Sequence, residues 1–337
     1  MYIKDLTNLS GVSGAEDEVR DYIKETIKGK VDKLDVDTMG NIIAFKKGKK
    51  SNLKVMLAAH MDEVGFMVTS IGDMGAVKFK SVGGIDNRIL AGKRVLIGEN
   101  KVKGVIGIKP IHQQERAERA AGLDIKKLFI DIGSDKKEET EKKIDLGDFI
   151  SFDSDYEEFG EGFIKAKALD DRVGCSLLME LLDMNFDFDL YACFTVQEEV
   201  GLRGAKIAGY AVDPDIAIVL EGTTSNDLPE VDEHEKSTIL GNGPVLTFMD
   251  KSSIADKDLN AYIEKCGQRK GVKYQYKHTV SGGNDAGSIQ RNKKGVKVAV
   301  VAVPLRYIHT DVSVMKKSDY EDFKTLMIEA LEGLDKI

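Results

Sequence analysis

Several features that would place this chain in a common class are missing from its sequence. No run approaches the eighteen apolar residues that a membrane-spanning helix needs, and the N-terminus has no basic segment leading into an apolar one. We therefore expect neither a membrane span nor a secretory signal. Positive charge is not in excess, because the net charge is −8 and both signs are interspersed. This balance argues against a nucleic-acid-binding protein.

Cysteine and tryptophan are also scarce. The three cysteines, Cys175, Cys193 and Cys266, lie far apart, are odd in number and form no CxxC pair. This pattern is typical of reduced thiols, so we expect a cytoplasmic protein without disulfides or a zinc finger. The absence of tryptophan removes a residue that would stack on sugars in a glycan-binding cleft.

What is present is an ordinary globular composition, with 42% apolar and 31% charged residues over 337 positions. That length favours two domains over one. Helices and strands alternate at both ends of the chain, which indicates an α/β domain whose central sheet carries helices on both faces. The expected helices cover residues 15–28, 170–184 and 318–334. The expected strands cover residues 33–37, 41–48, 53–59, 64–72, 188–196, 215–221 and 297–303.

Between residues 72 and 156 the pattern changes to short β-like runs separated by glycine. These runs are "AVKFKSV", "KRVLIG", "VKGVIGIK", "LFIDIG" and "DFISFD". Such spacing favours a small β-barrel. We therefore expect a catalytic α/β domain of residues 1–71 and 157–337, interrupted by a β-barrel-like domain of residues 72–156.

The stretch "MLAAHMDEVGFMV" places polar side chains at the end of an apolar strand. His60 and Asp62 are two residues apart, so in extended chain they point the same way. An imidazole beside a carboxylate is either a metal ligand with its orienting partner or a polar pair that caps a strand. This stretch alone does not decide between them.

Four further stretches place ionisable groups at the ends of elements in the α/β domain. "KALDDRVG" carries Asp170 and Asp171 at a helix start, where a helix N-cap is the simpler explanation. "FTVQEEVGLRGA" carries Glu198 and Glu199, "AIVLEGTTSND" carries Glu221, and "LRYIHTDVS" carries His309. Ligands bind open α/β sheets at the carboxyl ends of strands, where most of these groups fall. Two histidines and three carboxylates would suit two divalent ions, with one glutamate of the Glu198–Glu199 pair on a metal and its neighbour free to act as a base.

With these motifs in place, the chain resembles the M42 family of metalloaminopeptidases, which are tetrahedral, dodecameric peptidases. The segments that carry the resemblance are "AHMDEVGFMV", "GGIDNRILAGKRV", "KALDDRVG", "TVQEEVGLRGA" and "RYIHT", in the family's order over nearly the whole chain. The resemblance implies an aminopeptidase domain with a barrel insertion used in dimer contacts. It also implies a homo-oligomer, a dodecamer built from dimers, that acts on peptides with a free N-terminus.

The resemblance also implies a role for each site residue. His60 and Glu221 would hold one metal, Glu199 and His309 the other, and Asp170 would bridge them. Glu198 would be the general base, and Asp62 would orient His60. The two metals would be Zn²⁺ or Co²⁺, with Mn²⁺ as a third option. Glu221 stands where aspartate is frequent in the family, which bears on the geometry of the first site.

Three alternatives remain open from the sequence. Some relatives are labelled endoglucanases, but a glycosidase pair needs carboxyl groups about 5 to 10 Å apart, and adjacent glutamates on an extended strand would point to opposite faces. A scaffold with a structural metal site is a second alternative, although structural zinc sites are rich in cysteine or histidine. Finally, "SGGNDAGSIQ" either cradles the substrate near Asp285 or caps a helix at Asn284 or Asp285.

Overall fold

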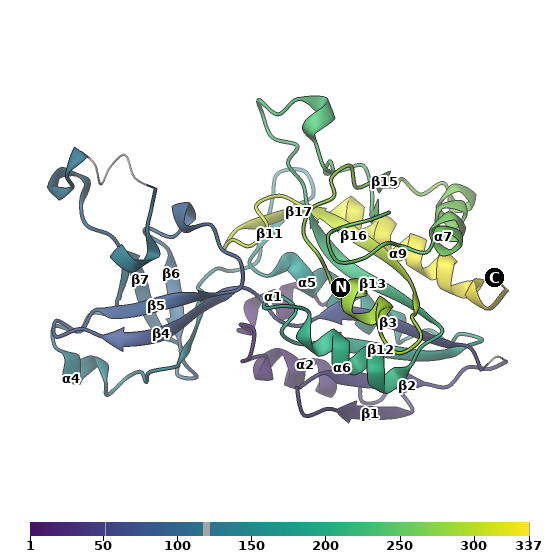
Figure 1. Cartoon of the computed structure of the whole chain (residues 1–337), viewed down its shortest axis with the longest axis horizontal. Helices are drawn as coiled ribbons and strands as arrows, with labels where there is room; N and C mark the ends of the chain where they lie inside the picture. The colour runs from purple at the N-terminus through teal and green to yellow at the C-terminus, as the bar shows by residue number, and fades with distance from the viewer. Residues whose placement is uncertain (51, 117–121, 337) are drawn as a thin grey trace.

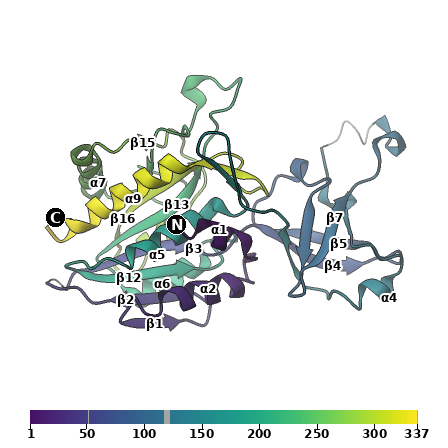
Figure 2. The same ribbon diagram turned by 180° about the vertical axis from the view of Figure 1, so that it is seen from behind.

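The computed structural model describes residues 1–50, 52–116 and 122–336 and shows two unequal parts. The larger part is a sheet covered by helices, and the smaller part is a β-barrel that projects from one end of it (Figure 1). The view from behind shows the same separation, with narrow connections between the two parts (Figure 2). Among the described residues, no helix combines the length and the apolar character needed to cross a membrane.

The larger part is built on an eight-stranded mixed sheet. Its strands, in spatial order, are β1 (Lys33–Val36), β2 (Ile42–Lys46), β12 (Asp189–Thr195), β3 (Lys54–His60), β13 (Ile216–Thr224), β16 (Lys297–Leu305), β14 (Val245–Leu246) and β15 (Gln275–Tyr276). The four central strands, β12, β3, β13 and β16, run parallel to one another. Their near-continuous burial matches the apolar runs expected for parallel strands that are covered on both faces.

Helices cover both faces of this sheet, as predicted. One face packs against α1 (Ile3–Asn8), α2 (Asp17–Ile27), α5 (Leu169–Leu181), α7 (Lys257–Lys270) and α9 (Lys317–Glu332). The other face packs against α6 (Arg203–Val212) and α8 (Ala286–Gln290). Alternate residues of β3 divide between the two cores, with Leu57 on the first face and Met56 and Ala58 on the second.

The smaller part is a closed six-stranded antiparallel barrel with its own apolar core. Its strands follow one another in the order β4 (Gly65–Ile71), β5 (Val77–Val82), β8 (Phe129–Asp131), β7 (Val102–Gly107), β6 (Arg94–Ile97) and β9 (Phe149–Phe152), and β9 pairs again with β4. The five β-like runs predicted after residue 72 supply five of these strands. The sixth, β4, lies before the predicted start of the insertion, because an apolar strand pattern does not reveal which sheet the strand will join.

Smaller elements complete the chain. A three-stranded sheet of β10 (Glu157–Phe159), β11 (Phe163–Ala166) and β17 (Ser313–Lys316) lies where the barrel returns to the larger part. The barrel also carries α4 (Lys137–Thr140), and short 3₁₀ turns occur at Asn87–Ile89, Ile111–Gln113, Ile125–Lys127, Glu233–Glu235 and Leu334–Lys336. The three predicted helices correspond to α2, α5 and α9, whereas α1, α6 and α7 were not predicted.

Candidate metal centre

The residues predicted to bind metal converge at the carboxyl ends of the parallel strands. His60 is the last residue of β3, Glu221 lies near the end of β13, and Glu198 and Glu199 follow β12. Asp170 comes from the start of α5 and His309 from the loop after β16. All six line one cavity of about 390 Å³, which is within the range of small-molecule sites.

His60 is held so that one ring nitrogen faces the cavity cluster. Its Nδ1 lies 3.1 Å from the backbone oxygen of Asp62 and 3.5 Å from the Asp62 carboxylate. Its Nε2 lies 3.3 Å from Asp170 and 3.4 Å from Glu221. The side chain of His60 is 2% exposed, so its orientation is fixed by these contacts, and Nε2 is the nitrogen available to a metal.

Asp170 lies between the two histidines. Its Oδ1 faces His60, and its Oδ2 is 3.4 Å from His309 Nε2. His309 Nε2 is also 3.1 Å from Glu199 Oε1, while His309 Nδ1 lies 2.8 Å from the backbone oxygen of Gly84, just beyond the last barrel residue of β5. One carboxylate oxygen directed at each histidine is the arrangement expected of a ligand shared by two ions.

A left-handed turn after β12 brings both glutamates to this cluster. Gln197 has φ = +55°, a conformation that L-residues seldom adopt. The chain is therefore not extended at this point, and Glu198 and Glu199 both offer an oxygen within 4.8 Å of a nitrogen of His60. The expectation that the two side chains would point to opposite faces was wrong, because it assumed an extended chain at Glu198 and Glu199.

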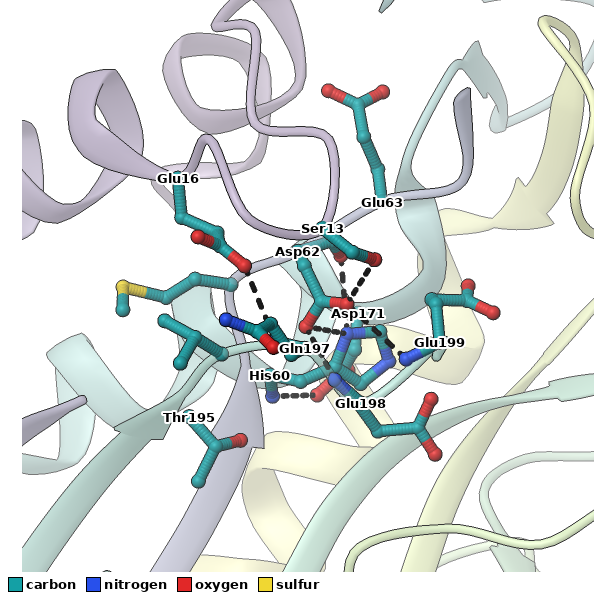
Figure 3. A network of polar contacts seen from close by, with 12 residues as sticks. Ser13, Glu16, His60, Asp62, Glu63, Asp171, Thr195, Gln197, Glu198 and Glu199 are labelled. Atoms are coloured by element: carbon teal, nitrogen blue, oxygen red, sulfur yellow. Dashed lines mark hydrogen bonds and ion pairs between the residues drawn. The ribbon is translucent and has the colours of Figure 1, made fainter. Parts of the chain in front are cut away.

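Asp62 holds this turn in place. Its Oδ1 accepts the backbone N–H of Glu198 at 2.9 Å, and its Oδ2 accepts the backbone N–H of Glu199 at 3.1 Å (Figure 3). The Ser13 hydroxyl donates to the same Oδ2 at 2.6 Å. Burial acts to raise the pKa of Asp62, but the hydrogen bonds from His60, Ser13 and the Glu198 N–H outweigh it and lower that pKa. Asp62 thus orients His60 and the glutamate pair together.

The electrostatics of the cluster favour bound cations. Burial raises the pKa of Glu221 to about 8 despite the nearby His60. Burial also raises the pKa of Glu198, and Glu221, Asp285 and Glu199 add to the rise while His60 opposes it. Such shifts arise where carboxylates crowd together with too little positive charge. Oxygen- and nitrogen-bearing ligands of this kind suit divalent ions such as Zn²⁺, Co²⁺ or Mn²⁺.

In the two histidines, contacts with these carboxylates outweigh burial and stabilise the protonated imidazole. Burial acts to lower the pKa of His309, but its hydrogen bonds to Asp170 and Glu199 raise it to about 11. For His60, burial is likewise outweighed by the field of Glu221 and the contacts with Asp170 and Asp62, which raise its pKa well above the ordinary value. Both imidazoles therefore lie in a strongly negative environment, and a divalent ion would be favoured there for the same reason as a proton.

Asp171 belongs to the same region but differs from these ligands. Its Oδ2 accepts the backbone N–H of His60 at 3.1 Å, and its Oδ1 accepts the backbone N–H of Gly174 at 2.9 Å. Both oxygens are used by the backbone, so Asp171 is better suited to fix the end of β3 than to bind an ion. Within the part of the chain that the structure describes, its neighbour Asp170 accepts no hydrogen bond from the backbone and faces the two histidines instead.

Sequence reasoning missed several residues that shape the site. Ser13 supports Asp62, and Gly84 supplies the carbonyl oxygen that lies 2.8 Å from His309 Nδ1. Lys277, which follows β15, also lines the cavity. The glycine-rich loop 281–284 lines it as well, and this segment was offered from the sequence as a possible cradle for the substrate. The Asp285 side chain makes no cap hydrogen bond and accepts from Thr195 instead.

Comparison with known proteins agrees with this geometry. The profile of the M42 glutamyl aminopeptidase family matches residues 40–326. The chain belongs to the M42 family of aminopeptidases. It is therefore a peptide-bond hydrolase. A lysyl aminopeptidase of Pyrococcus furiosus is 30% identical to this M42 aminopeptidase, with 98% of this chain and 96% of the relative covered.

Solved structures add the fold and the assembly of relatives. The TET aminopeptidase of Thaumarchaeota archaeon SCGC AB-539-E09 is 34% identical, with a TM-score of 0.95 over 99% of this chain and 96% of the other. A Thermotoga maritima protein described as an endoglucanase is 38% identical, with a TM-score of 0.83 over 98% and 97%. The TET1 peptidase of Pyrococcus horikoshii, which assembles into a tetrahedron or an octahedral shell, is 32% identical, with a TM-score of 0.86 over 98% of both chains.

Proposed function

We propose that this M42 aminopeptidase uses two divalent metal ions to remove single residues from the free N-termini of peptides. His60 and Glu221 would hold one ion, Glu199 and His309 the other, and Asp170 would bridge them. The observation that carries this assignment is the position of Asp170, whose two oxygens face the two histidines at 3.3 and 3.4 Å.

Two ions bound there would lower the pKa of a shared water and polarise the scissile carbonyl. The chain's own part in the reaction would be to move protons. Glu198 lines the cavity with a raised pKa, so it can take a proton from the attacking water and return it to the departing amine. Asp62 would keep Glu198 in position through the backbone N–H that it accepts.

The shape of the cavity supports attack at a chain end. The proposed ligands and the glycine-rich loop 281–284 line the same cavity. A space of about 390 Å³ accommodates the end of a peptide but not a folded chain. We therefore infer that a substrate enters with its N-terminus directed at the metals.

The glycosidase alternative receives less support from the site. A glycosidase places two carboxyl groups about 5 to 10 Å apart across a sugar ring. Here the acidic groups offer oxygens within 4.8 Å of histidine nitrogens and of one another, which is the spacing of ligands around an ion. A purely structural metal site is also disfavoured, because Glu198 lines the cavity without being needed as a ligand.

We further propose that the chain forms a homo-oligomer, a dodecamer built from dimers, through its barrel. Met74, Val105 and Leu146 expose large apolar side chains on the barrel, at 79%, 47% and 67%. Exposed apolar side chains of this kind favour contact with another protein surface, here a second copy of the chain. Sedimentation velocity of the metal-loaded protein would test this proposal, and a monomer at micromolar concentration would refute it. The cytoplasmic location remains a prediction from the sequence.

The decisive experiment compares free and N-acetylated aminoacyl-p-nitroanilides in the presence of Zn²⁺, Co²⁺ or Mn²⁺. We expect metal-dependent cleavage of the free-amine substrates alone. Glu198→Gln should abolish turnover while two ions per subunit remain bound by elemental analysis, whereas the exposed Glu161→Gln should behave as the wild type. Release of reducing sugar from a β-glucan with no cleavage of any free-amine substrate would refute the proposal.

A further inference from the structure

The turn that carries Glu198 and Glu199 is held by side chains from distant segments. Four successive backbone N–H groups, those of residues 196–199, donate to side-chain oxygens. Val196 donates to Asn41 at 3.0 Å, Gln197 to Glu16 at 3.2 Å, and Glu198 and Glu199 to Asp62 at 2.9 and 3.1 Å. The carbonyls of residues 196–198 accept from the backbone N–H groups of residues 201–204. Because backbone polar groups away from water need partners, the shape of this turn depends on the three side chains that accept its N–H groups.

Glu16 is the acceptor that comes from the N-terminal part of the chain. It is the N-cap residue of α2, where a short polar side chain normally accepts from the first turn of the helix. The Glu16 side chain makes no such cap hydrogen bond. Its Oε1 accepts instead from the backbone N–H of Gly14 at 2.7 Å and from that of Gln197. Figure 3 shows the carboxylate directed at Gln197. The side chain therefore binds a residue 181 positions away in the sequence and leaves its own helix uncapped.

Glu16 is buried in surroundings that do not favour a negative charge. It is 3% exposed, so water does not replace its partners. Burial raises the pKa of Glu16 to about 7, the backbone N–H of Gly14 opposes that rise, and the charge of Asp62 adds to it. A carboxyl group beside a second carboxylate is costly to bury unless hydrogen bonds compensate. The backbone N–H groups of Gly14 and Gln197 are therefore the contacts that hold the Glu16 side chain in place.

Both of these donors use the same oxygen of Glu16, and this decides which substitutions should matter. An oxygen that accepts as part of a carboxylate also accepts as the carbonyl oxygen of a protonated acid or of an amide. The hydrogen bonds from Gly14 and Gln197 therefore require an acceptor at this position but no negative charge. Glutamine would keep that acceptor, and alanine would remove it.

Gln197 is the residue at which the chain leaves the extended conformation. Its φ of +55° is unfavourable for an L-residue and persists only where neighbouring contacts enforce it. Glu16 contacts Gln197 itself, whereas Asp62 contacts the two residues that follow. Without the acceptor on Glu16, Gln197 would be free to relax to a commoner conformation. That relaxation would redirect the Glu198 side chain, because Glu198 is the next residue along the chain.

On these grounds we infer that Glu16 is a positioning residue for peptide hydrolysis, which fixes the left-handed turn at Gln197 and, through that turn, the direction of Glu198. This inference rests on the proposed role of Glu198 as the general base. Glu16 is not among the described residues that line the catalytic cavity, so it would touch neither the substrate nor the ions. It would act only through the backbone of the turn.

The kinetic test compares Glu16→Ala with Glu16→Gln on one free-amine p-nitroanilide at full metal loading. We expect Glu16→Ala to lower kcat by about 10- to 100-fold with KM nearly unchanged, because the residues that contact the substrate stay in place. Glu16→Gln should keep kcat within about threefold of the wild-type value. The matched control is Glu25→Ala, at an exposed position of α2, which should behave as the wild type. A wild-type kcat in Glu16→Ala, or an equal loss of kcat in both Glu16 variants, would overturn the inference.

Amide hydrogen exchange, measured by mass spectrometry, tests the role of Glu16 independently of turnover. In Glu16→Ala, exchange should be about tenfold faster in the turn of residues 196–199, while β12 and β3 keep their protection. Glu16→Gln should exchange like the wild type. Faster exchange confined to the turn, in a protein that cleaves no peptide, would support the role of Glu16 in the turn and refute the proposed function. Peptide cleavage with unchanged exchange at the turn would overturn the inference and leave the aminopeptidase function intact. Faster exchange over the whole sheet would indicate a general loss of stability and would overturn the local role of Glu16.

Discussion

A buried cluster of charges behind the metal centre allows a sharp test of how the site is held together. Glu63 accepts from Lys167 Nζ at 2.7 and 2.9 Å and from the backbone of Gly11 at 3.0 Å, and Arg172 lies 3.5 Å away. The Glu63 side chain points away from the ring of His60 (Figure 3). Glu63 and Lys167 are each 2% exposed and Arg172 is fully buried, so water cannot replace a lost partner.

Glu63→Gln keeps the shape of the side chain and removes its charge. It would leave two buried cations without a counter-ion, which costs about 3–5 kcal/mol of unfolding free energy. For a chain of this size we expect a fall in Tm of about 6–15 °C by calorimetry. The matched control is Asp187→Asn, whose ion pair with Lys50 is largely exposed. That change should cost less than about 1 kcal/mol.

The pH dependence of the Tm of Glu63→Gln tests whether unpaired buried charge is the cause of its lower stability. Burial lowers the pKa of Lys167 below its unfolded value, although Glu63 opposes that shift. A lysine whose folded pKa is lowered destabilises the fold at neutral pH, and the penalty disappears as pH rises towards the unfolded pKa of about 10.4. Removing Glu63 increases the penalty, so the Tm gap between wild type and Glu63→Gln should narrow from pH 7 to pH 10.

The double variant Glu63→Gln with Lys167→Met completes the design. It removes one unpaired cation, while Arg172 keeps the carbonyls of Met61 and Leu6 as acceptors. Its Tm should lie above that of Glu63→Gln alone. A Glu63→Gln variant within 2 °C of the wild type, or a double variant less stable than the single one, would refute the view that Glu63 is needed to neutralise its two buried neighbours.

Three other outcomes follow from the geometry of the site. Asp62→Asn offers one acceptor oxygen to the three donors that Asp62 now serves. We therefore expect kcat to fall by about 10- to 100-fold, with little change in the circular dichroism spectrum. An unchanged kcat would contradict the positioning role of Asp62. Removal of metal by a chelator should lower Tm, and Zn²⁺ should restore it in a concentration-dependent way; an identical Tm with and without metal would argue against ions in the acidic cluster. Cys175, Cys193 and Cys266 are free and buried, so a thiol reagent should modify none of them in the native protein and all three after unfolding, as counted by mass spectrometry.

The convergence of the ligands could be predicted because it depends on topology. Once a parallel sheet is inferred, side chains that follow its strands must meet at one edge, and His60, Glu221 and the glutamate pair obey this rule. The inserted barrel could also be predicted from the sequence, because its short strands and glycine turns form a local pattern.

The residues that the sequence did not reveal depend on contacts between distant segments. The left-handed turn at Gln197 has no glycine to mark it, so an extended chain was expected at the two glutamates that follow it. Ser13 reaches Asp62 across 49 positions of sequence, and Lys277 enters the cavity only because β15 joins the far edge of the sheet. No local periodicity encodes such pairings.

The contact between His309 and Gly84, which follows barrel strand β5, has a consequence for attempts to shorten this enzyme. The Gly84 carbonyl lies 2.8 Å from His309 Nδ1, and Lys93 of the barrel pairs at 2.8 Å with Asp311 in the same loop as His309. Excising the barrel to obtain a minimal catalytic core would therefore remove the groups that orient His309, which we propose as a ligand of the second ion. A truncated core would need a new acceptor for the His309 imidazole to keep that ring in its present position.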